Sequence, residues 1–403
     1  MPTPPLYIDT PDQLGDLCAK LAGTPWIVMD TEFLREKTYF PKFCLLQIAA
    51  PDVVACVDPI ALESLGPLFD ILFDPGIIKI FHSGRQDLEI FYNLCGKLPG
   101  PVFDTQIAAP LLGLGEQISY AGLVAELLGV NLTKSHSRTD WTRRPLSPEQ
   151  LSYAADDVIY LEQAYLAMLP RLEKLGRLTW LEADFKELLD PSNYENPPEL
   201  AWQRIGGVNQ LKNKPLSIVQ TLAAWREQTA RSQDLPRGWV IKDDALLDLA
   251  RQQPTNLDDL KLVRGLDERM VKRHGMVICR LIQEAMGNPP RTLEHRPRSS
   301  KKTGEQDAVL DLLMAVVRLR AAQNTLNPTL LASRKDLEQL FDDDPHARLL
   351  HGWRKTMVGD ELAAVLRGEM ALKIVNGGLS IGSDCDANSA LSGTTPPTLG
   401  AVA

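Results

Sequence analysis

The residues best suited to chemistry are two acids at the end of an apolar run. Residues 26–29, Trp-Ile-Val-Met, lead directly into Asp30-Thr31-Glu32. A continuous apolar run of this kind is typical of a buried strand. Because strand side chains alternate, Asp30 and Glu32 point to the same side and can share one cation. Two solvated acids at a strand end would give the same pattern, so the pair alone defines no site.

Two further segments add carboxylates at the ends or on the faces of helices. Asp87 lies in the first turn of a helix expected after the strand that ends at His82, where the helix dipole favours an acid even without a metal. Tyr153 and Asp157 lie four residues apart on another expected helix and share one face, whereas Asp156 is rotated away. Four buried carboxylates repel one another unless they hold cations or have raised pKa values. The set therefore predicts a site for hard divalent cations that act on a phosphate.

The order of these residues resembles that of a known family. The resemblance covers about residues 5–190. The chain resembles the tyrosine-bearing branch of the DEDD exonucleases. Its segment from residue 134 to 161 resembles the bacterial ribonuclease D family in particular. Three motifs carry it: Asp30-Thr31-Glu32, His82-x-x-x-x-Asp87 and Tyr153-x-x-x-Asp157.

The resemblance implies a fold, a cofactor and a substrate. The fold is an RNase H-like three-layer α/β domain with a mixed sheet, and the cofactor is two divalent metal ions, Mg²⁺ or Mn²⁺. The activity is release of nucleoside 5′-monophosphates, one at a time, from the 3′ end of an RNA. Transfer RNA precursors and other structured RNAs are the substrates that the family suggests.

Two-metal hydrolysis gives each motif residue an expected role. One ion lowers the pKa of a bound water and the other stabilises the departing 3′ oxygen. We expect Asp30 to bridge both ions, and Glu32 and Asp157 to hold the ion that carries the attacking water. Asp87 should support the second ion through waters, because Mg²⁺ keeps part of its hydration shell. Tyr153 should orient the attacking water by a hydrogen bond, since its ordinary pKa is far above neutrality.

Basic and aromatic residues outside the motifs are candidate RNA contacts. A basic loop precedes the Tyr153 helix, where cations could bind phosphates or simply face solvent. Trp141 beside them could stack on a base or pack in the core. Later cations lie in the helical half of the chain. The candidates are Lys134, Arg138, Trp141, Arg143, Arg144, Arg226, Arg237, Lys242, Lys272 and Arg273.

The elements that must position these residues follow a mixed pattern. We expect strands at 6–8, 26–33, 44–49, 53–58, 77–82 and 101–104, with the third and fourth joined as a hairpin. We expect helices at 10–22, 62–73, 86–94 and 105–114, and a helical stretch from 119 to 188 with a break at 129–148. Strands mixed with helices indicate a three-layer α/β domain that ends near residue 190.

The length of 403 residues exceeds one ordinary core and predicts several domains. Residues 1–200 should form the exonuclease domain, and residues 190–200 at its end have the composition of a linker. Residues 205–290 read as all-helical and resemble a helicase-and-RNase-D C-terminal (HRDC) domain. Residues 303–385 resemble a second, degenerate copy of the HRDC domain. We expect this copy to be helical from residue 305 to residue 372. Residues 386–403 are rich in Ser, Thr, Gly and Pro and are expected to be disordered.

Charge and cysteine content narrow the class of protein. Residues 1–204 carry 16 Lys and Arg against 28 Asp and Glu, whereas residues 205–290 carry 13 against 10. An acidic metal site beside a mildly basic region suits work on a polyanion. No segment approaches the roughly 20 apolar residues of a membrane span, and the six cysteines are scattered without Cys-x-x-Cys pairs. We expect a cytoplasmic protein with reduced thiols, no membrane association and no obligate protein partner.

Two other functions fit parts of the pattern. A 3′→5′ DNA exonuclease would use the same acids, because metal ligands do not discriminate between sugars and only contacts to the 2′-hydroxyl do. A catalytically silent RNA-binding protein is the second alternative. The complete set of acids argues against that second alternative.

Overall fold

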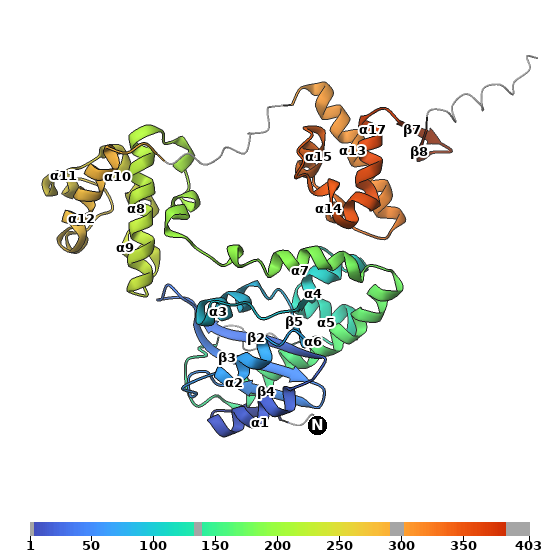
Figure 1. The fold of residues 1–403 in the computed structure, drawn as a ribbon, viewed down its shortest axis with the longest axis horizontal. Helices are drawn as coiled ribbons and strands as arrows, with labels where there is room; N and C mark the ends of the chain where they lie inside the picture. The colour runs from blue at the N-terminus through green and yellow to red at the C-terminus, as the bar shows by residue number, and fades with distance from the viewer. Residues whose placement is uncertain (1–3, 133–138, 291–301, 384–403) are drawn as a thin grey trace, which may run out of the picture. The chain divides into compact units, whose positions relative to one another are not determined.

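The structure is a computed structural model that describes residues 4–132, 139–290 and 302–383. Figure 1 shows the fold of the chain. By compactness the chain divides into two units. The first unit comprises Met1–Asp104, Leu132–Gln163 and Phe185–Arg296, and the second comprises Thr105–Asn131, Ala164–Asp184 and Pro297–Ala403. The expected tail at 386–403 lies outside the described residues.

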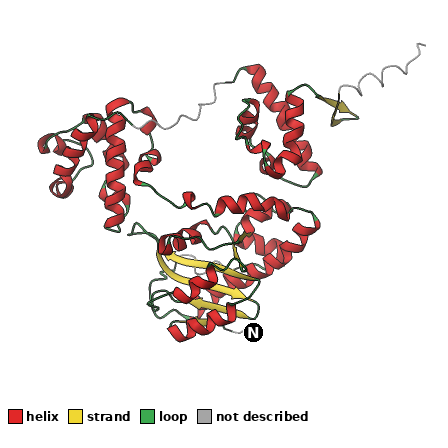
Figure 2. Cartoon of the chain, in the orientation of Figure 1, coloured by secondary structure: helices red, strands yellow, loops and turns green. Residues whose placement is uncertain are grey.

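A six-stranded mixed sheet forms the centre of the first unit (Figure 2). The strand order is β1-β4-β3-β2-β5-β6. The strands β2, β3 and β4 pair antiparallel, and the remaining neighbours pair parallel. The mixed sheet expected from the sequence is therefore confirmed. The strands are β1 Leu6–Ile8, β2 Trp26–Leu34, β3 Lys42–Ala50, β4 Val53–Val57, β5 Ile78–Phe81 and β6 Val102–Asp104.

Helices cover both faces of this sheet and complete the expected three layers. On one face, α1 (Pro11–Leu21), α2 (Gly66–Leu72) and α3 (Arg85–Cys95) pack on buried strand residues such as Met29 and Ile48. On the other face, Leu45 and Cys56 pack against Ala154 of α6 (Pro148–Lys174). Alternation along β2 and β3 thus sends one set of side chains to each helical layer.

One helix of the first unit is shorter than expected. α2 begins at Gly66, whereas the apolar spacing predicted a start at residue 62. Pro67 lies in the first turn of the observed helix, the position where proline is tolerated. A helix that began at residue 62 would place this proline in its interior, where the ring clashes with the preceding turn. The apolar spacing alone therefore misplaced the start.

The rest of the first unit is mostly helical, with breaks that include residues 234–236 and 253–255. The linker expected at 190–200 is partly ordered as two short 3₁₀ helices, and Trp202 of the second packs into the core of this helical part. The helices are η3 Pro191–Asn193, η4 Pro198–Arg204, η5 Val208–Gln210, α8 Asn213–Ser232, α9 Arg237–Val240, α10 Asp243–Gln252, α11 Leu257–Lys261 and α12 Glu268–Met286.

The second unit joins two short segments of the N-terminal half to the C-terminal helices. Trp180 stacks on Trp353 with ring centroids 4.5 Å apart, and the Arg177 guanidinium donates to the carbonyls of Leu111 and Asn324. Its helices are α4 Thr105–Ala108, η1 Ala109–Leu112, α5 Tyr120–Leu128, the end of α6, η2 Leu178–Leu181, α13 Gly304–Gln323, α14 Pro328–Leu331, α15 Arg334–Phe341, η6 Arg348–Leu350, α16 Gly352–Arg354, η7 Lys355–Gly359 and α17 Asp360–Leu366. α7 (Glu182–Leu188) continues from this unit into the first.

A β-hairpin ends the described chain and was not predicted. β7 (Met370–Val375) pairs antiparallel with β8 (Gly378–Ser383). The two residues between them, Asn376 and Gly377, both have positive φ, as a tight two-residue hairpin turn requires. The expectation of helix to residue 372 was therefore wrong at its end.

Candidate active site

The five motif residues come together from three elements of the first unit. Asp30 and Glu32 lie on β2, Asp87 lies in the first turn of α3, and Tyr153 and Asp157 lie on α6. Asp87 is buried and accepts a hydrogen bond from the Thr31 hydroxyl, which ties α3 to the motif strand. The Asp30 carboxyl is close enough to the other three acids that each of them raises its pKa.

Burial raises the pKa of every acid in the set, and repulsion by other members of the set adds to the shifts of Asp30 and Glu32. Burial, then the charges of Asp87, Asp157 and Glu32, hold the pKa of Asp30 well above its usual range. Burial, then Asp157 and Asp87, raises the pKa of Glu32 to about 8. Burial raises the pKa of Asp87 to about 6, although the hydrogen bond from Thr31 lowers this pKa. Burial, then Asp156, raises the pKa of Asp157 to about 7. Without cations the site therefore retains protons near neutral pH.

The turn between β5 and α3 sets the position of Asp87. Ser83 has a left-handed backbone with φ 62°, and a Cβ added at Gly84 would lie 2.5 Å from the Cβ of Phe81. The Asp104 carboxylate accepts hydrogen bonds from the backbone N–H of Ser83 at 3.0 Å and of Gly84 at 2.8 Å. This brace from β6 fixes the start of α3, a role that the sequence analysis missed.

The start of α6 orients Tyr153 and Asp157. The Ser147 hydroxyl accepts from the Gln150 N–H at 3.2 Å, and the Gln150 side chain accepts from the Ser147 N–H at 2.8 Å, which together form a capping box. The Tyr153 ring lies 6.3 Å from that of Trp141, centroid to centroid. Burial, then the charges of Asp157, Glu32 and Asp30, raises the pKa of Tyr153. Its hydroxyl therefore stays protonated and can donate a hydrogen bond.

The chemistry of the donor set fits divalent cations. Four carboxylates supply the hard oxygen ligands that Mg²⁺ and Mn²⁺ prefer, and the positive charge would relieve the repulsion that raises their pKa values. Across residues 4–132, 139–290 and 302–383, no three acidic, His or Cys side chains already stand in a position to hold one metal ion. Ions at this site would therefore draw the carboxylates together or complete their coordination with water and phosphate oxygens.

Two of the expected RNA contacts are buried, which corrects their assignment. Trp141 is 4% exposed and packs with Cys44 and Leu45, so it offers no face to a base. Arg226 is also 4% exposed, and its guanidinium donates to the Ile241 carbonyl and to the Asp243 carboxylate at 2.6 Å. Both side chains therefore stabilise the fold.

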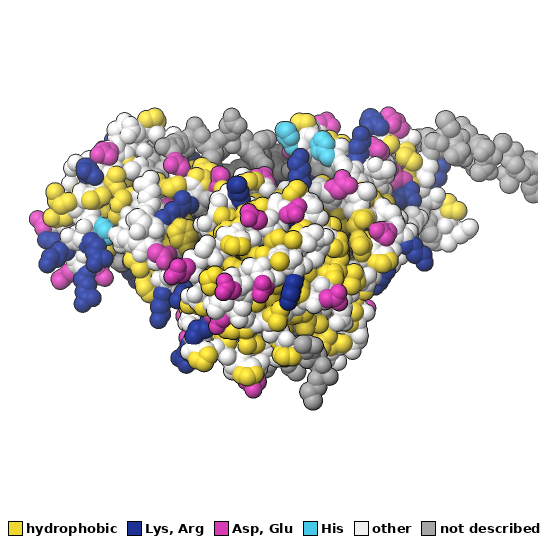
Figure 3. All heavy atoms as spheres, turned by 60° about the horizontal axis from the view of Figure 1, so that its bottom comes forward, with side chains coloured by type: hydrophobic (Ala, Val, Ile, Leu, Met, Phe, Trp, Pro, Cys, Tyr) yellow, Lys and Arg dark blue, Asp and Glu magenta, His cyan; other side chains and the backbone are white. Residues whose placement is uncertain are grey.

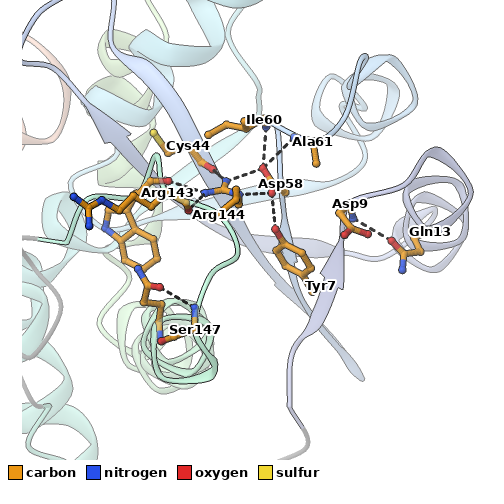
Figure 4. Close-up of polar contacts among 12 residues, drawn as sticks. Tyr7, Asp9, Gln13, Cys44, Asp58, Ile60, Ala61, Arg143, Arg144 and Ser147 are labelled. Atoms are coloured by element: carbon orange, nitrogen blue, oxygen red, sulfur yellow. Dashed lines mark hydrogen bonds and ion pairs between the residues drawn. The ribbon is translucent and has the colours of Figure 1, made fainter.

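The assignment of Arg144 as an RNA contact is also corrected, because its guanidinium is hydrogen-bonded within the protein (Figure 4). Its Nε donates to Asp58 at 2.5 Å, and its Nη2 donates to Asp58 and to the Cys44 carbonyl, each at 2.7 Å. The Tyr7 hydroxyl donates to the same carboxylate at 2.5 Å. The guanidinium is thus used by acceptors of the protein itself, and phosphate contact is not its role. Lys242 is exposed and stays a predicted contact, whereas Lys134 and Arg138 lie outside the described residues.

This arrangement, acids on a central strand and two flanking helices of a mixed sheet, defines a nuclease of the 3′-5′ exonuclease class. Residues 5–173 match the family model described as 3′-5′ exonuclease, and residues 216–282 match that of the HRDC domain. Divalent-metal dependence goes with this exonuclease class. The chain belongs to the ribonuclease D family, which confirms the activity expected from the sequence, a hydrolytic 3′→5′ exoribonuclease.

Relatives match over nearly the whole chain. Ribonuclease D of Sphingobium indicum is 40% identical over 94% of this chain and 98% of its own length. Ribonuclease D of Granulibacter bethesdensis is 37% identical over 92% of this chain and 94% of its own. The crystal structure of Escherichia coli RNase D, described as an exoribonuclease involved in structured RNA processing, aligns with a TM-score of 0.77 at 32% identity. That alignment covers 91% of this chain and 99% of the solved one. Within the described ranges, none of the helices is long and apolar enough to cross a membrane.

Proposed function

We propose that this protein trims the 3′ ends of structured RNAs, transfer RNA precursors among them, and releases nucleoside 5′-monophosphates one at a time. The partly buried cluster of four carboxylates, which repel one another around Asp30 and lie beside a protonated tyrosine, carries this proposal. The relative from E. coli, which acts in structured RNA processing, supports the substrate class. Asp30, Glu32, Asp87 and Asp157 would hold two divalent ions, Mg²⁺ or Mn²⁺.

The residues of the site divide the work of hydrolysis. The ions, when bound, lower the pKa of water and stabilise negative charge on the departing oxygen. Thr31 holds Asp87 by its hydroxyl, so this carboxylate keeps one orientation. The Tyr153 hydroxyl, protonated because of its raised pKa, orients the attacking water by a hydrogen bond and does not remove its proton. The contact with Trp141 holds the tyrosine ring in place.

Replacing Tyr153 by Phe should lower kcat by about 100-fold, because the oriented hydrogen bond to the water is lost. The Mn²⁺ affinity of the free protein should change little, since the tyrosine is not one of the proposed ligands. Single-turnover RNA cleavage and Mn²⁺ titration by calorimetry measure the two quantities. Tyr160→Phe, on the same helix, is the matched control. A Tyr153→Phe enzyme with wild-type kcat would contradict the proposed role.

A cavity of about 750 Å³ in the first unit is the proposed path of the RNA strand. Its wall includes Arg35, three residues after Glu32, and Tyr92 of α3, together with Arg204 and Arg237. Cations and aromatic rings together suit a single strand, because cations track the phosphates and rings stack on bases. Figure 3 shows further Lys and Arg side chains gathered over the α9–α12 region at the left.

Arg204→Ala and Arg237→Ala should each raise the KM for a 3′-overhanging RNA by about five-fold and reduce the salt dependence of binding, because each removes a phosphate contact. The value of kcat at saturating RNA should stay near that of the wild type. Arg251→Ala, an exposed arginine of α10 outside the cavity lining, is the control for lost charge. Equal KM values for all three variants would exclude this cavity as the path.

The decisive experiment compares matched 3′-overhanging RNA and DNA with Mg²⁺, Mn²⁺ or EDTA, resolved at single nucleotides. A metal-dependent ladder of mononucleotide release from RNA alone is the expected result. Equal ladders on both strands would support a 3′→5′ DNA exonuclease. Binding without cleavage would support a silent RNA-binding protein.

The domain organisation expected from the sequence also enters the proposal. The exonuclease domain spans residues 1–200, the HRDC domain 205–290, and a second, degenerate copy 303–385. Equal helix lengths support the repeat: α8 and α13 have 20 residues each, and α9 and α14 have four each. The copy has Val316-Val317 or Val317-Arg318 at the place of Trp225-Arg226, so the Trp-Arg pair is not repeated.

We also propose a cytoplasmic location without an obligate protein partner. The cysteines support it: Cys18, Cys44, Cys56, Cys95 and Cys279, all within the described ranges, are free thiols. Structural disulfides accumulate in oxidising compartments and are rare in the cytosol.

A further inference from the structure

The side-chain amide of Gln47 is an exception in the packing of the first unit. Gln47 lies on β3 and is 0% exposed. Neither its Oε1 nor its Nε2 has a hydrogen-bond partner among the described residues. Burying an unpaired amide lowers stability, and an apolar side chain of the same length would avoid the cost. A group of this kind needs an explanation in function.

The sheet register places this amide beside the catalytic acids. Gln47 lies directly opposite Asp30 on β2 and directly opposite Cys56 on β4. Residues opposed in antiparallel pairs project to the same face with their Cβ atoms about 5 Å apart. Cys56 packs with Ala154 of α6 on that face, and Asp157 contributes, after burial, to raising the pKa of Cys56 to about 12. The amide therefore lies between Asp30 and the Cys56 thiol, on the face that α6 covers.

We propose that Gln47 is a positioning residue for the metal-binding carboxylate of Asp30. With ions bound, its Nε2–H would donate to a carboxylate oxygen of Asp30, the residue directly opposite on β2. The Cys56 S–H donates instead to the Leu151 carbonyl at 4.0 Å, so the thiol does not compete for this amide N–H. This inference rests on the proposed function, because it requires Asp30 to hold a metal ion. Metal ligands are commonly oriented by such outer hydrogen bonds.

A neutral amide suits this place better than the other polar side chains. An arginine or lysine would pair with Asp30 and compete with the cation for its charge. A further acid would add repulsion to a cluster whose pKa values are already raised. An apolar residue would leave the carboxylate free to turn. The amide orients Asp30 without changing the charge of the site.

Gln47→Met tests the proposal because methionine keeps the length and removes both polar atoms. In EDTA the variant should melt at the wild-type temperature or above it, since no unpaired amide remains. The dissociation constant for Mn²⁺, measured by calorimetry without RNA, should rise by about 10-fold. RNA cleavage should need correspondingly more Mn²⁺ and recover at saturating metal. Leu46→Met, on the same strand with its side chain in the opposite layer, should leave the Mn²⁺ affinity unchanged.

The outcomes separate this inference from the proposed function. A Gln47→Met protein that binds Mn²⁺ within two-fold of the wild type overturns the positioning role. If Asp30→Asn also binds Mn²⁺ like the wild type, the proposed metal site itself fails. Should Gln47→Met not fold, a crystal structure of the wild-type protein with Mn²⁺ decides. Nε2 within hydrogen-bond distance of the Asp30 carboxylate supports the inference, and an amide bonded elsewhere overturns it.

Discussion

Asp30→Asn should lower kcat/KM on a 3′-overhanging RNA by about 1,000-fold or more, equivalent to about 4 kcal/mol of transition-state stabilisation. Asp30 lies at the centre of the acid set, because the other three carboxylates all raise its pKa. An amide of the same shape keeps the packing but removes a charged ligand that both proposed ions would share. Cleavage at single-nucleotide resolution measures the loss.

The folded state of this variant should survive the change. In EDTA its melting temperature should equal or exceed that of the wild type, because one of the repelling carboxylates is gone. The wild type should gain stability from Mn²⁺, since an ion that binds only the folded state stabilises it, and the variant should lose most of this gain. Asp156→Asn, one residue from Asp157 on the same helix, is the matched control and should cleave like the wild type. More than a tenth of wild-type activity in Asp30→Asn would remove Asp30 from the metal site.

Local rules were sufficient to predict the acids of the site. The period of two in a strand places Asp30 and Glu32 on one side, and the period of 3.6 in a helix places Tyr153 and Asp157 on one face. Each relation spans only a few residues. The meeting of the three motifs was predicted only from the resemblance. In the structure β2, which carries Asp30 and Glu32, lies beside β5, which leads into the helix that carries Asp87.

The same rules could not predict which acceptors the arginine side chains bind. Arginine suits solvent, phosphate and protein acceptors equally, and its partner is set by contacts far along the chain. Arg144 pairs with Asp58, 86 residues away. Gln47 shows the same limit, because only the register between β2 and β3 places its amide beside Asp30.

Two errors had a local signal that apolar spacing outweighed. Pro67 marks the first turn of α2, and Asn376-Gly377 is the dipeptide most typical of a two-residue hairpin turn. In both places apolar spacing suggested a longer helix. Proline and Asn-Gly restrict the backbone directly, whereas apolar spacing is shared by helices of any length, so these signals should have taken precedence.

Arg144→Met should lower the free energy of unfolding by about 3 kcal/mol, because it leaves the buried Asp58 carboxylate without its cation. The Asp58 side chain is 0% exposed and that of Arg144 is 22% exposed. The Asp58→Asn/Arg144→Met double variant should lose less than the sum of the single variants, since neither charge then stays buried alone. Urea unfolding at pH 7 measures all three. The folded Arg144→Met protein should cleave RNA with the wild-type KM, because the guanidinium makes no phosphate contact.

The pH dependence of the same pair provides an independent check. Burial raises the pKa of Asp58, but the hydrogen bonds from Arg144 and Tyr7 outweigh it, so the pKa lies below its usual value. A depressed pKa stabilises the folded state above the unfolded value of about 3.9, and this stabilisation is lost as the pH falls through the folded pKa. Without Arg144 the pKa of Asp58 rises, so protonation in mild acid relieves the unpaired charge. The difference in unfolding free energy between wild type and Arg144→Met should therefore narrow from pH 7 toward pH 4. A constant difference over this range would show that Arg144 stabilises the fold by packing alone.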